Sequence, residues 1–269
     1  MRAKMSRYFN GLTTVNVELT SRCNKDCWMC GRRKVDRDHP EITMNYGDMD
    51  LKLVASIAKQ LPDGIVVQLH SNGEPLLYPQ FKEAAGLFKR QIRCMDTNGK
   101  LLVVKADEII GNLDTLTVST FESDEDAEEQ YGLIKEFLRI KEGRKPNVII
   151  RCLGNVDIAR YKSLGCIIAT RILHSPMGSF KYKKRPTIPE IGICLDLLNH
   201  MVIRRDGKVS PCVRFDPNGL GIIGNCTITP LIDIWNSSER KEWVKYHIEG
   251  RRDQKPLCSY CEFWGVPTG

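Results

Sequence analysis

The chain has 269 residues, enough to bury a large core, and its hydrophobic share of 42% is ordinary for a globular protein. No apolar run reaches membrane-spanning length, and no apolar signal segment follows the basic N-terminus. The chain has eleven cysteines, many of them at ligand spacings, which favours metal binding in a reducing cytoplasm over a disulfide scaffold. The formal net charge is +7, but aromatic residues do not alternate with the basic clusters, so we expect neither a nucleic-acid partner nor a membrane.

A thiol-rich loop follows the first predicted strand. Residues 1–14 show no pattern and are expected to form an extension, whereas the alternation that follows predicts a strand over 15–20. Directly after it come Cys23, Cys27 and Cys30, in a C-x3-C-x2-C spacing. The carboxyl end of a strand is where parallel α/β proteins place their chemistry. Three thiolates can hold three irons of a [4Fe–4S] cube and leave the fourth open, and the alternative is a zinc knuckle or chance spacing.

From residue 15 to 174, short apolar runs alternate with helical stretches, a pattern typical of parallel βα units. The expected later strands are 65–70, 92–96, 115–120, 148–152 and 166–173, and the expected helices are 48–61, 79–90, 105–111 and one that ends near 143. We interpret the acidic run 122–129 as the start of that last helix, where carboxylates accept free N–H groups. Six units predict an α/β fold, an incomplete (β/α)6 TIM-like barrel.

Two turns identify a family resemblance. Asn-Gly-Glu-Pro at 72–75 follows the second expected strand, and Thr-Asn-Gly at 97–99 follows the third. Together with the cysteine spacing, this order resembles the radical S-adenosylmethionine (SAM) enzymes, which carry a GGEP-like turn and a TNG turn at these places. The residue before the third cysteine is usually aromatic in that family and is Met29 here, beside Trp28. In that family the residue at this position contacts the adenine of SAM largely through its backbone, so the resemblance implies the same contact for Met29.

The resemblance implies a SAM site beside a first [4Fe–4S] cluster held by Cys23, Cys27 and Cys30. The implied cofactor-binding residues are Met29, Asn72, Gly73, Glu74, Asn98, Ser119 and Arg151. The turn at 72–74 matches the one that binds the methionyl amino group, and Ser119 ends the strand that commonly contacts the ribose. Arg151 would pair with the SAM carboxylate, or else form an ordinary ion pair at a strand end.

A second cysteine set follows a predicted linker at 175–192, within a small α+β module at 193–269. Cys194, Cys212, Cys258 and Cys261 flank an Asp-Gly hairpin signal at 206–207 and a helical stretch over 230–248. Four thiols close a metal site, and their chemistry allows either zinc or a second [4Fe–4S] cluster. By contrast, Cys94, Cys152 and Cys166 lie in apolar runs and are interpreted as buried small hydrophobes, while Cys226 is left unassigned.

The order of features in this module resembles the SPASM/Twitch modules of radical SAM enzymes, and favours a cluster over zinc. One set of four cysteines is similar to the one-cluster Twitch form. Within the family, the length, the cysteine spacing and this tail are most similar to a dehydrogenase of a small-molecule alcohol. The implied cofactors are therefore SAM and two [4Fe–4S] clusters.

The resemblance implies reductive cleavage of SAM to a 5′-deoxyadenosyl radical, hydrogen abstraction from a small molecule and its two-electron oxidation. The implied partner is a one-electron reductant such as a flavodoxin or ferredoxin. The alternatives are radical modification of a peptide and a non-enzymatic zinc module, although zinc would not require the two turns.

Polar residues at the expected strand ends are candidates for the substrate side. They are His70, Asp96, Thr120 and His174. His70 and His174 are the candidates for a catalytic base, and the alternative for each is a structural polar role.

Overall fold

The structure, a computed structural model, describes residues 8–171, 173, 193–259 and 261. A single sheet runs through it, in the order β6-β5-β4-β3-β2-β1-β7-β8-β9. Its strands are β1 (Thr14–Val17), β2 (Val66–Gln68), β3 (Ile92–Thr97), β4 (Thr115–Phe121), β5 (Asn147–Leu153), β6 (Ile167–Arg171), β7 (His200–Ile203), β8 (Lys208–Ser210) and β9 (Gly224–Asn225). The six expected barrel strands are confirmed, each within a few residues of its predicted bounds.

The strands β1 to β6 are all parallel, and their carboxyl ends therefore meet at one edge of the sheet. Alternate residues of each strand face opposite sides. In β4, Leu116 and Val118 are fully buried, whereas Ser119 lies on the other face beside Arg151 of β5. One face thus carries the apolar core and the other carries polar groups.

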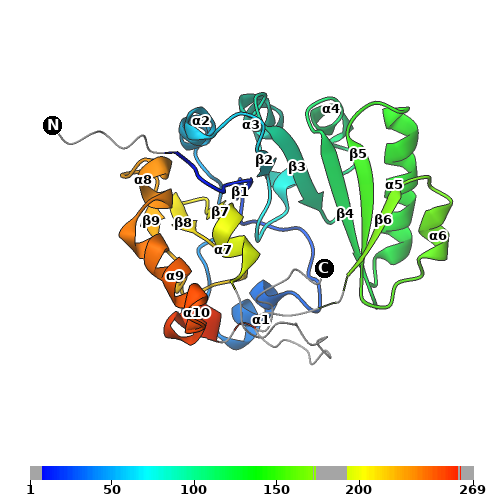
Figure 1. Ribbon diagram of the computed structural model, residues 1–269. Helices are drawn as coiled ribbons and strands as arrows, with labels where there is room; N and C mark the ends of the chain where they lie inside the picture. Colours follow the sequence, from blue (N-terminus) through cyan, green and yellow to red (C-terminus); the bar gives the residue numbers. More distant parts are fainter. Residues whose placement is uncertain (1–7, 172, 174–192, 260, 262–269) are drawn as a thin grey trace.

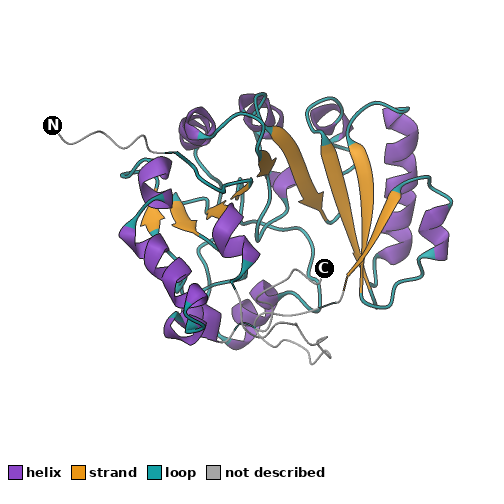
Figure 2. Ribbon diagram, in the orientation of Figure 1, coloured by secondary structure: helices purple, strands orange, loops and turns teal. Residues whose placement is uncertain are grey.

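Helices cover the apolar face. The longer helices are α1 (Gly31–Asp38), α2 (Leu51–Gln60), α3 (Phe81–Leu87), α5 (Ala127–Lys141) and α9 (Ser238–Ile248). The shorter ones are α4 (Ala106–Ile109), α6 (Ala159–Lys162), α7 (Leu195–Asn199), α8 (Leu231–Trp235) and α10 (Pro256–Ser259), with the 3-10 turns η1 (Pro40–Ile42), η2 (Pro75–Leu77) and η3 (Arg252–Gln254). Figure 1 shows α2, α3, α4 and α5 along the outside of the curved row of strands, and Figure 2 separates these helices from the loops at the strand ends. The fold is α/β, as the sequence predicts.

The hairpin of the cysteine-rich segment extends the barrel sheet. Strand β7 pairs in parallel with β1, and β8 turns back antiparallel to β7. The turn between them is the expected Asp-Gly, and Gly207 takes a positive φ of 81° that favours glycine. The second cysteine set is thereby fixed to the strand that precedes the first set. The expected linker, 175–192, lies outside the described residues, and the domain division remains a prediction.

Two helix predictions are wrong in detail. The stretch 230–248 forms two helices, because Ser237 stops the first and caps α9 by accepting a hydrogen bond from the backbone N–H of Arg240. The helix expected from the acidic run begins only at Ala127, and the acidic residues before it lie in the loop after β4. That loop contacts the first cysteine set.

Candidate functional site

The first three thiols lie on the loop that joins β1 to α1, at the carboxyl edge of the sheet. Cys23, Cys27 and Cys30 are all half-buried, and Cys30 directly precedes the first residue of α1. Burial and the neighbouring thiol of Cys30 raise the pKa of Cys27 to about 12. A thiolate there needs a compensating cation, which iron in a cluster supplies.

The Asn-Gly-Glu-Pro turn packs directly against this loop. The backbone N–H of Glu74 donates to the carbonyl oxygen of Arg22, at 2.8 Å. At Gly73 an added Cβ would overlap the carbonyl oxygen of Thr20 and lie 2.7 Å from that of Arg22. Both neighbours are backbone and have no room to move aside. Glycine at this position is therefore required by the close approach of the turn to the cysteine loop.

The Glu74 carboxylate links the two family turns. It is 2% exposed, and it accepts hydrogen bonds from the Thr97 hydroxyl at 2.8 Å and the Asn98 backbone N–H at 2.8 Å. Burial raises the pKa of Glu74 to about 7, against the opposing effect of these hydrogen bonds. In this structure its oxygens hold the turns together, and its predicted contact with a SAM amino group stays a prediction.

The raised pKa of Glu74 predicts a pH-dependent stability. As pH rises from 4.5, the unfolded chain loses this proton first, while the folded chain keeps it until about pH 7. The group's contribution to stability should therefore fall across this interval, by up to about 3 kcal/mol at about 1.4 kcal/mol per pKa unit. Glu74→Gln should remove that fall.

Thermal unfolding of both proteins, prepared anaerobically, at several values between about pH 4.5 and about pH 7.5 tests this linkage. The exposed Glu83, replaced by Gln, is the control. A constant difference between wild type and Glu74→Gln across the interval would contradict the assignment.

Asn72 is held by residues on both sides of the loop. Its backbone N–H and its side-chain amide both donate to Glu18, at 3.2 and 3.0 Å, and its carbonyl oxygen accepts from Arg32 at 3.0 Å. Glu18 is fully buried and also accepts from the backbone N–H of Arg205, which follows β7. Sequence reasoning missed Glu18 and Arg32, which fix the turn in place.

Asn98 of the Thr-Asn-Gly turn reaches the first thiol. Its side-chain nitrogen lies 3.8 Å from the Cys23 sulfur and donates to the Asn24 side chain at 2.9 Å. The carbonyl oxygens of Asn98 and Ser119 both accept from Gln130 of α5, at 2.6 and 3.0 Å. The structure thus brings three of the predicted residues, Cys23, Asn98 and Ser119, into one connected region.

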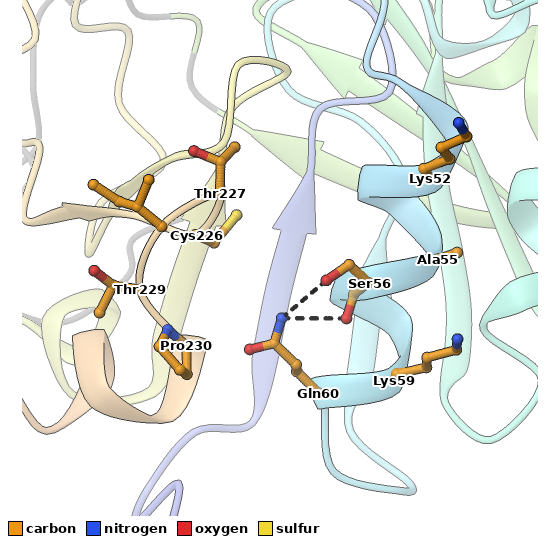
Figure 3. Close-up of a pocket in the computed structure, with 10 residues that line it drawn as sticks. Lys52, Ala55, Ser56, Lys59, Gln60, Cys226, Thr227, Thr229 and Pro230 are labelled. Carbon is orange, nitrogen blue, oxygen red and sulfur yellow. Dashed lines mark hydrogen bonds between the residues drawn. The ribbon is translucent and has the colours of Figure 1, made fainter.

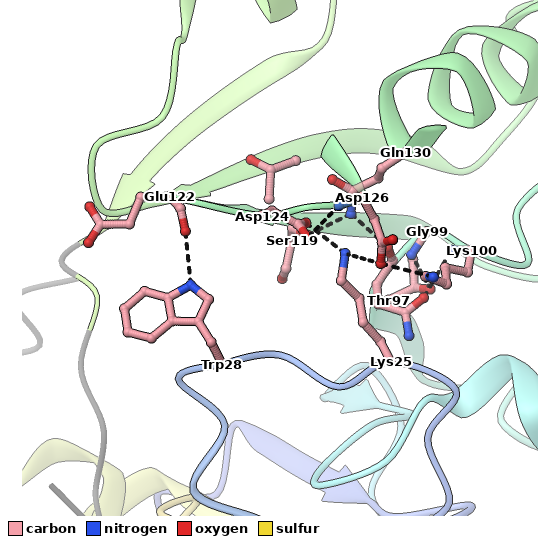
Figure 4. Close-up of polar contacts among 12 residues, drawn as sticks. Lys25, Trp28, Thr97, Gly99, Lys100, Ser119, Glu122, Asp124, Asp126 and Gln130 are labelled. Carbon is pink, nitrogen blue, oxygen red and sulfur yellow. Dashed lines mark hydrogen bonds and ion pairs between the residues drawn. The ribbon is translucent and has the colours of Figure 1, made fainter. Parts of the chain in front are cut away.

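A buried ion pair holds the cysteine loop to the end of β4 (Figure 4). The Lys25 ammonium lies 2.6 Å from Asp124 and 4.8 Å from the centre of the Phe121 ring. The exposed fractions of the Lys25 and Asp124 side chains are 3% and 4%. Trp28, one place before the half-buried Met29, donates its indole N–H to the carbonyl oxygen of Glu122 at 3.1 Å. The acidic run therefore anchors the cysteine loop, in addition to preceding helix α5.

Lys25→Met should loosen this loop. Removing one partner leaves the Asp124 carboxylate buried without its cation, which costs about 3–5 kcal/mol in comparable buried pairs. We expect a lower midpoint of thermal unfolding and less iron retained in the first cluster after anaerobic gel filtration. The matched control is Lys100→Met, because Lys100 pairs with Asp126 at 2.9 Å but both groups are more exposed. Equal effects of the two variants would show that the buried pair has no special role.

Arg151, on β5, forms an ion pair across β4 with Asp96 of β3, and such an ion pair is the alternative that its sequence position left open. Its guanidinium pairs with both carboxylate oxygens of Asp96 on β3. His70 completes the group, because its Nδ1 accepts from the Asp96 backbone N–H at 3.0 Å and its Nε2 lies 3.3 Å from the carboxylate. Burial alone would raise the pKa of Asp96, but the effects of His70 and Arg151 outweigh burial, and the pKa of Asp96 is lowered.

These three residues lie on the polar face, at the carboxyl ends of their strands. Burial lowers the pKa of His70, which favours the neutral imidazole. Thr120, by contrast, faces the core and bonds the carbonyl oxygen of Arg151 at 3.3 Å, so it does not join them. His174 lies outside the described residues.

The second set of thiols lines one cavity. Cys194 precedes α7, Cys212 follows β8, and Cys258 and Cys261 belong to the last turn of the described chain. All four line one pocket, together with Asp196, Leu197, Pro211, Arg214, Trp243, His247 and Leu257. Burial raises the pKa of Cys258 to about 12 and also raises that of Cys212. Four soft donors around one pocket fit a fully ligated cluster.

Basic residues hold the last pair of thiols in place. Arg252 donates to the carbonyl oxygens of Cys258 and Cys261. Lys255 pairs with Glu239 at 3.1 Å and Glu242 at 2.6 Å, both on α9. Lys255 thereby connects the segment that carries Cys258 and Cys261 to α9.

The remaining cysteines lie apart from both sets. Cys152 is buried, as predicted, whereas Cys94 and Cys166 are only half-buried. Cys226 lines a separate pocket between α2 and the loop before α8, beside Gln60 and Thr227 (Figure 3). Within the described chain, no three His, Cys, Asp or Glu side chains surround a single ion-sized point. A [4Fe–4S] cube binds each thiolate to a different iron, so its ligands do not share such a point.

Comparisons with known proteins agree with this arrangement. Residues 194–262 match the SPASM family model, described as an iron–sulfur cluster-binding domain. The S-adenosyl-L-methionine-dependent 2-deoxy-scyllo-inosamine dehydrogenase of Niallia circulans is 24% identical in an alignment of 261 positions that covers 94% of each chain. It is a dehydrogenase, the kind of enzyme that the length and cysteine pattern of this chain resemble.

Solved structures share the fold. BtrN in complex with AdoMet and 2-DOIA superposes with a TM-score of 0.60 at 20% identity, over 93% of each chain. Streptococcus suis SuiB bound to S-adenosylmethionine superposes with a TM-score of 0.65 at 15% identity, over 94% of this chain and 73% of its own. Among the helices described here, none is long and apolar enough to span a membrane.

Proposed function

We infer that this chain, a radical SAM enzyme with a C-terminal SPASM iron–sulfur module, oxidises a small hydroxylated molecule by two electrons and consumes SAM in doing so. The observation that carries this proposal is the difference between the two thiol sets. Three thiols lie on one loop at the strand ends, whereas four thiols from separate elements line one pocket. A three-thiol site leaves one iron for SAM, and a four-thiol site leaves none for a ligand.

When bound, the two clusters and SAM supply a 5′-deoxyadenosyl radical at the first site and an acceptor for one electron at the second. The residues of this chain place and shield that chemistry. Gly73 lets its turn approach the cysteine loop, Glu74 joins the two turns, and Asn98 directs its amide at the Cys23 sulfur. We propose that Met29, Asn72, Ser119 and Arg151 complete the cofactor site.

The polar group formed by His70, Asp96 and Arg151 supports a hydroxylated substrate. Asp96 is an ionised carboxylate that accepts from two neighbours, and all three side chains are partly exposed on the polar face of the sheet. Such a group can orient hydroxyl or amino substituents through charge-assisted hydrogen bonds. The relative from Niallia circulans is named for an aminocyclitol of this chemistry, and each chain covers 94% of the other.

The proposed oxidation balances with SAM as the oxidant. The carbinol carbon gives one hydrogen atom to the deoxyadenosyl group, and the resulting substrate radical then loses one electron and the hydroxyl proton to form a carbonyl. We propose a flavodoxin or ferredoxin as the donor of the electron that cleaves SAM. Eleven free thiols and no disulfide support a reducing location such as the cytoplasm.

Deuterium tracing tests the proposal. Reduced protein is incubated with SAM and 2-deoxy-scyllo-inosamine, or related cyclitols, labelled at the carbinol carbon. We expect deuterium to be retained in released 5′-deoxyadenosine, and a product two mass units lighter than the unlabelled substrate in a parallel run. A product of unchanged mass that regains deuterium would instead indicate isomerisation with SAM recycling. A cross-link in an added peptide would favour peptide modification.

A further inference from the structure

His247, on α9, lies between two residues of the second thiol set. Its side chain is buried at 2% exposure, in the wall of the cavity that the four cysteines line. On one side its ring nitrogen Nδ1 is 3.3 Å from the backbone nitrogen of Cys194. On the other side Nε2 is 3.4 Å from the sulfur of Cys258. The ring therefore bridges the first and third cysteines of the set.

These contacts fix where the ring carries its proton. The backbone N–H of Cys194 is always a donor, so Nδ1 must accept and carries no hydrogen. The hydrogen of the neutral imidazole is then on Nε2, which donates it to the Cys258 sulfur. A second donor, the backbone N–H of Arg214, lies 3.5 Å from the Cys212 sulfur. The side chain of His247 is thus a donor to this set that a substitution can remove.

We propose that His247 makes the second cluster easier to reduce by donating a hydrogen bond to its Cys258 ligand. A cluster that gains an electron gains negative charge, part of which lies on its sulfurs. An N–H directed at a ligand sulfur therefore stabilises the reduced form more than the oxidised form. This inference rests on the proposed function, in which the second cluster accepts the electron of the substrate radical.

The burial of the contact strengthens this effect. Trp243 and Leu257 line the same pocket, so the surroundings of the imidazole are largely apolar. In a water-poor surrounding the hydrogen bond has a larger electrostatic influence than at the surface. Because Nδ1 is held by the Cys194 backbone, the ring cannot turn its proton away from the sulfur without losing that bond.

The test uses the full chain with Cys23, Cys27 and Cys30 replaced by alanine, so that only the second cluster contributes. Iron and zinc are measured first, because zinc in place of iron would refute the proposed function and leave this inference without its cluster. A potentiometric titration followed by electron paramagnetic resonance then compares His247→Phe with His247→Gln. We expect a more negative midpoint potential for His247→Phe, and recovery of most of the loss by His247→Gln, whose amide N–H can reach the sulfur. Tyr246→Phe, a neighbouring change on α9 outside the cavity wall, is the matched control.

A second measurement needs no change at position 247. In protein labelled with 15N-histidine, pulsed electron paramagnetic resonance of the reduced cluster should detect one weakly coupled histidine nitrogen and an exchangeable proton. Absence of that coupling, or an unchanged or more positive potential in His247→Phe, would overturn the proposal. If His247→Phe does not fold, the coupling and the potential of His247→Gln decide.

Discussion

Replacing Cys23, Cys27 and Cys30 together by alanine should abolish formation of 5′-deoxyadenosine and lower the iron content by about half. The three thiols are the ligands on the open loop, and the second set lies on other elements, around its own cavity. The second cluster should therefore remain. Anaerobic iron analysis and chromatographic measurement of 5′-deoxyadenosine in the presence of a reductant check both parts.

The control for this variant is the double replacement of Cys94 and Cys166 by alanine, since both are half-buried thiols outside either set. It should keep its iron and its SAM cleavage. Residual 5′-deoxyadenosine in the triple variant, or loss of all iron, would mean that the two sites are not independent in the way described.

Cys258→Ala should stop oxidation of the substrate while leaving SAM cleavage measurable. Cys258 is one of four ligands and also receives the His247 hydrogen bond, so its loss damages the second site alone. The first site is held by Lys25, Glu74 and Asn98, none of which contacts this cavity. The expected result is 5′-deoxyadenosine without an oxidised product, measured together by mass spectrometry.

Folding of this variant must be checked, because ligand loss in a small metal module removes folding energy. Circular dichroism and the iron of the first cluster serve for this purpose, and Cys226→Ala, in a separate pocket, is the control for the loss of a buried thiol. Normal product formation by a folded Cys258→Ala protein would contradict an electron-accepting role for the second site.

The strands and the two thiol sets could be predicted from the sequence because their signals are local. Short apolar runs predict β3 and β4, an Asp-Gly pair predicts the turn between β7 and β8, and cysteine spacing predicts the ligands. The order of the Asn-Gly-Glu-Pro and Thr-Asn-Gly turns further restricted the fold. Each of these signals can be recognised without knowing which residues distant in the sequence contact each other in the fold.

The residues that support the site were not predictable in the same way. Lys25 meets Asp124 across 99 positions, and His247 reaches Cys194 across 53. Neither a lysine between two cysteines nor a histidine on a mainly polar helix has a local feature that identifies its partner. Arg151 shows the same limit, because its strand position allowed a cofactor contact or an ion pair, and only the register of β3, β4 and β5 places Asp96 beside it.

The measurement that most directly tests the two-cluster arrangement is metal analysis of the unmodified chain, purified anaerobically and reconstituted with iron and sulfide. We predict about eight irons and about eight labile sulfides per chain, without stoichiometric zinc, because both thiol sets hold a [4Fe–4S] cube. About four irons together with about one zinc would contradict the account, since the four-thiol site would then be a structural zinc site unable to accept an electron.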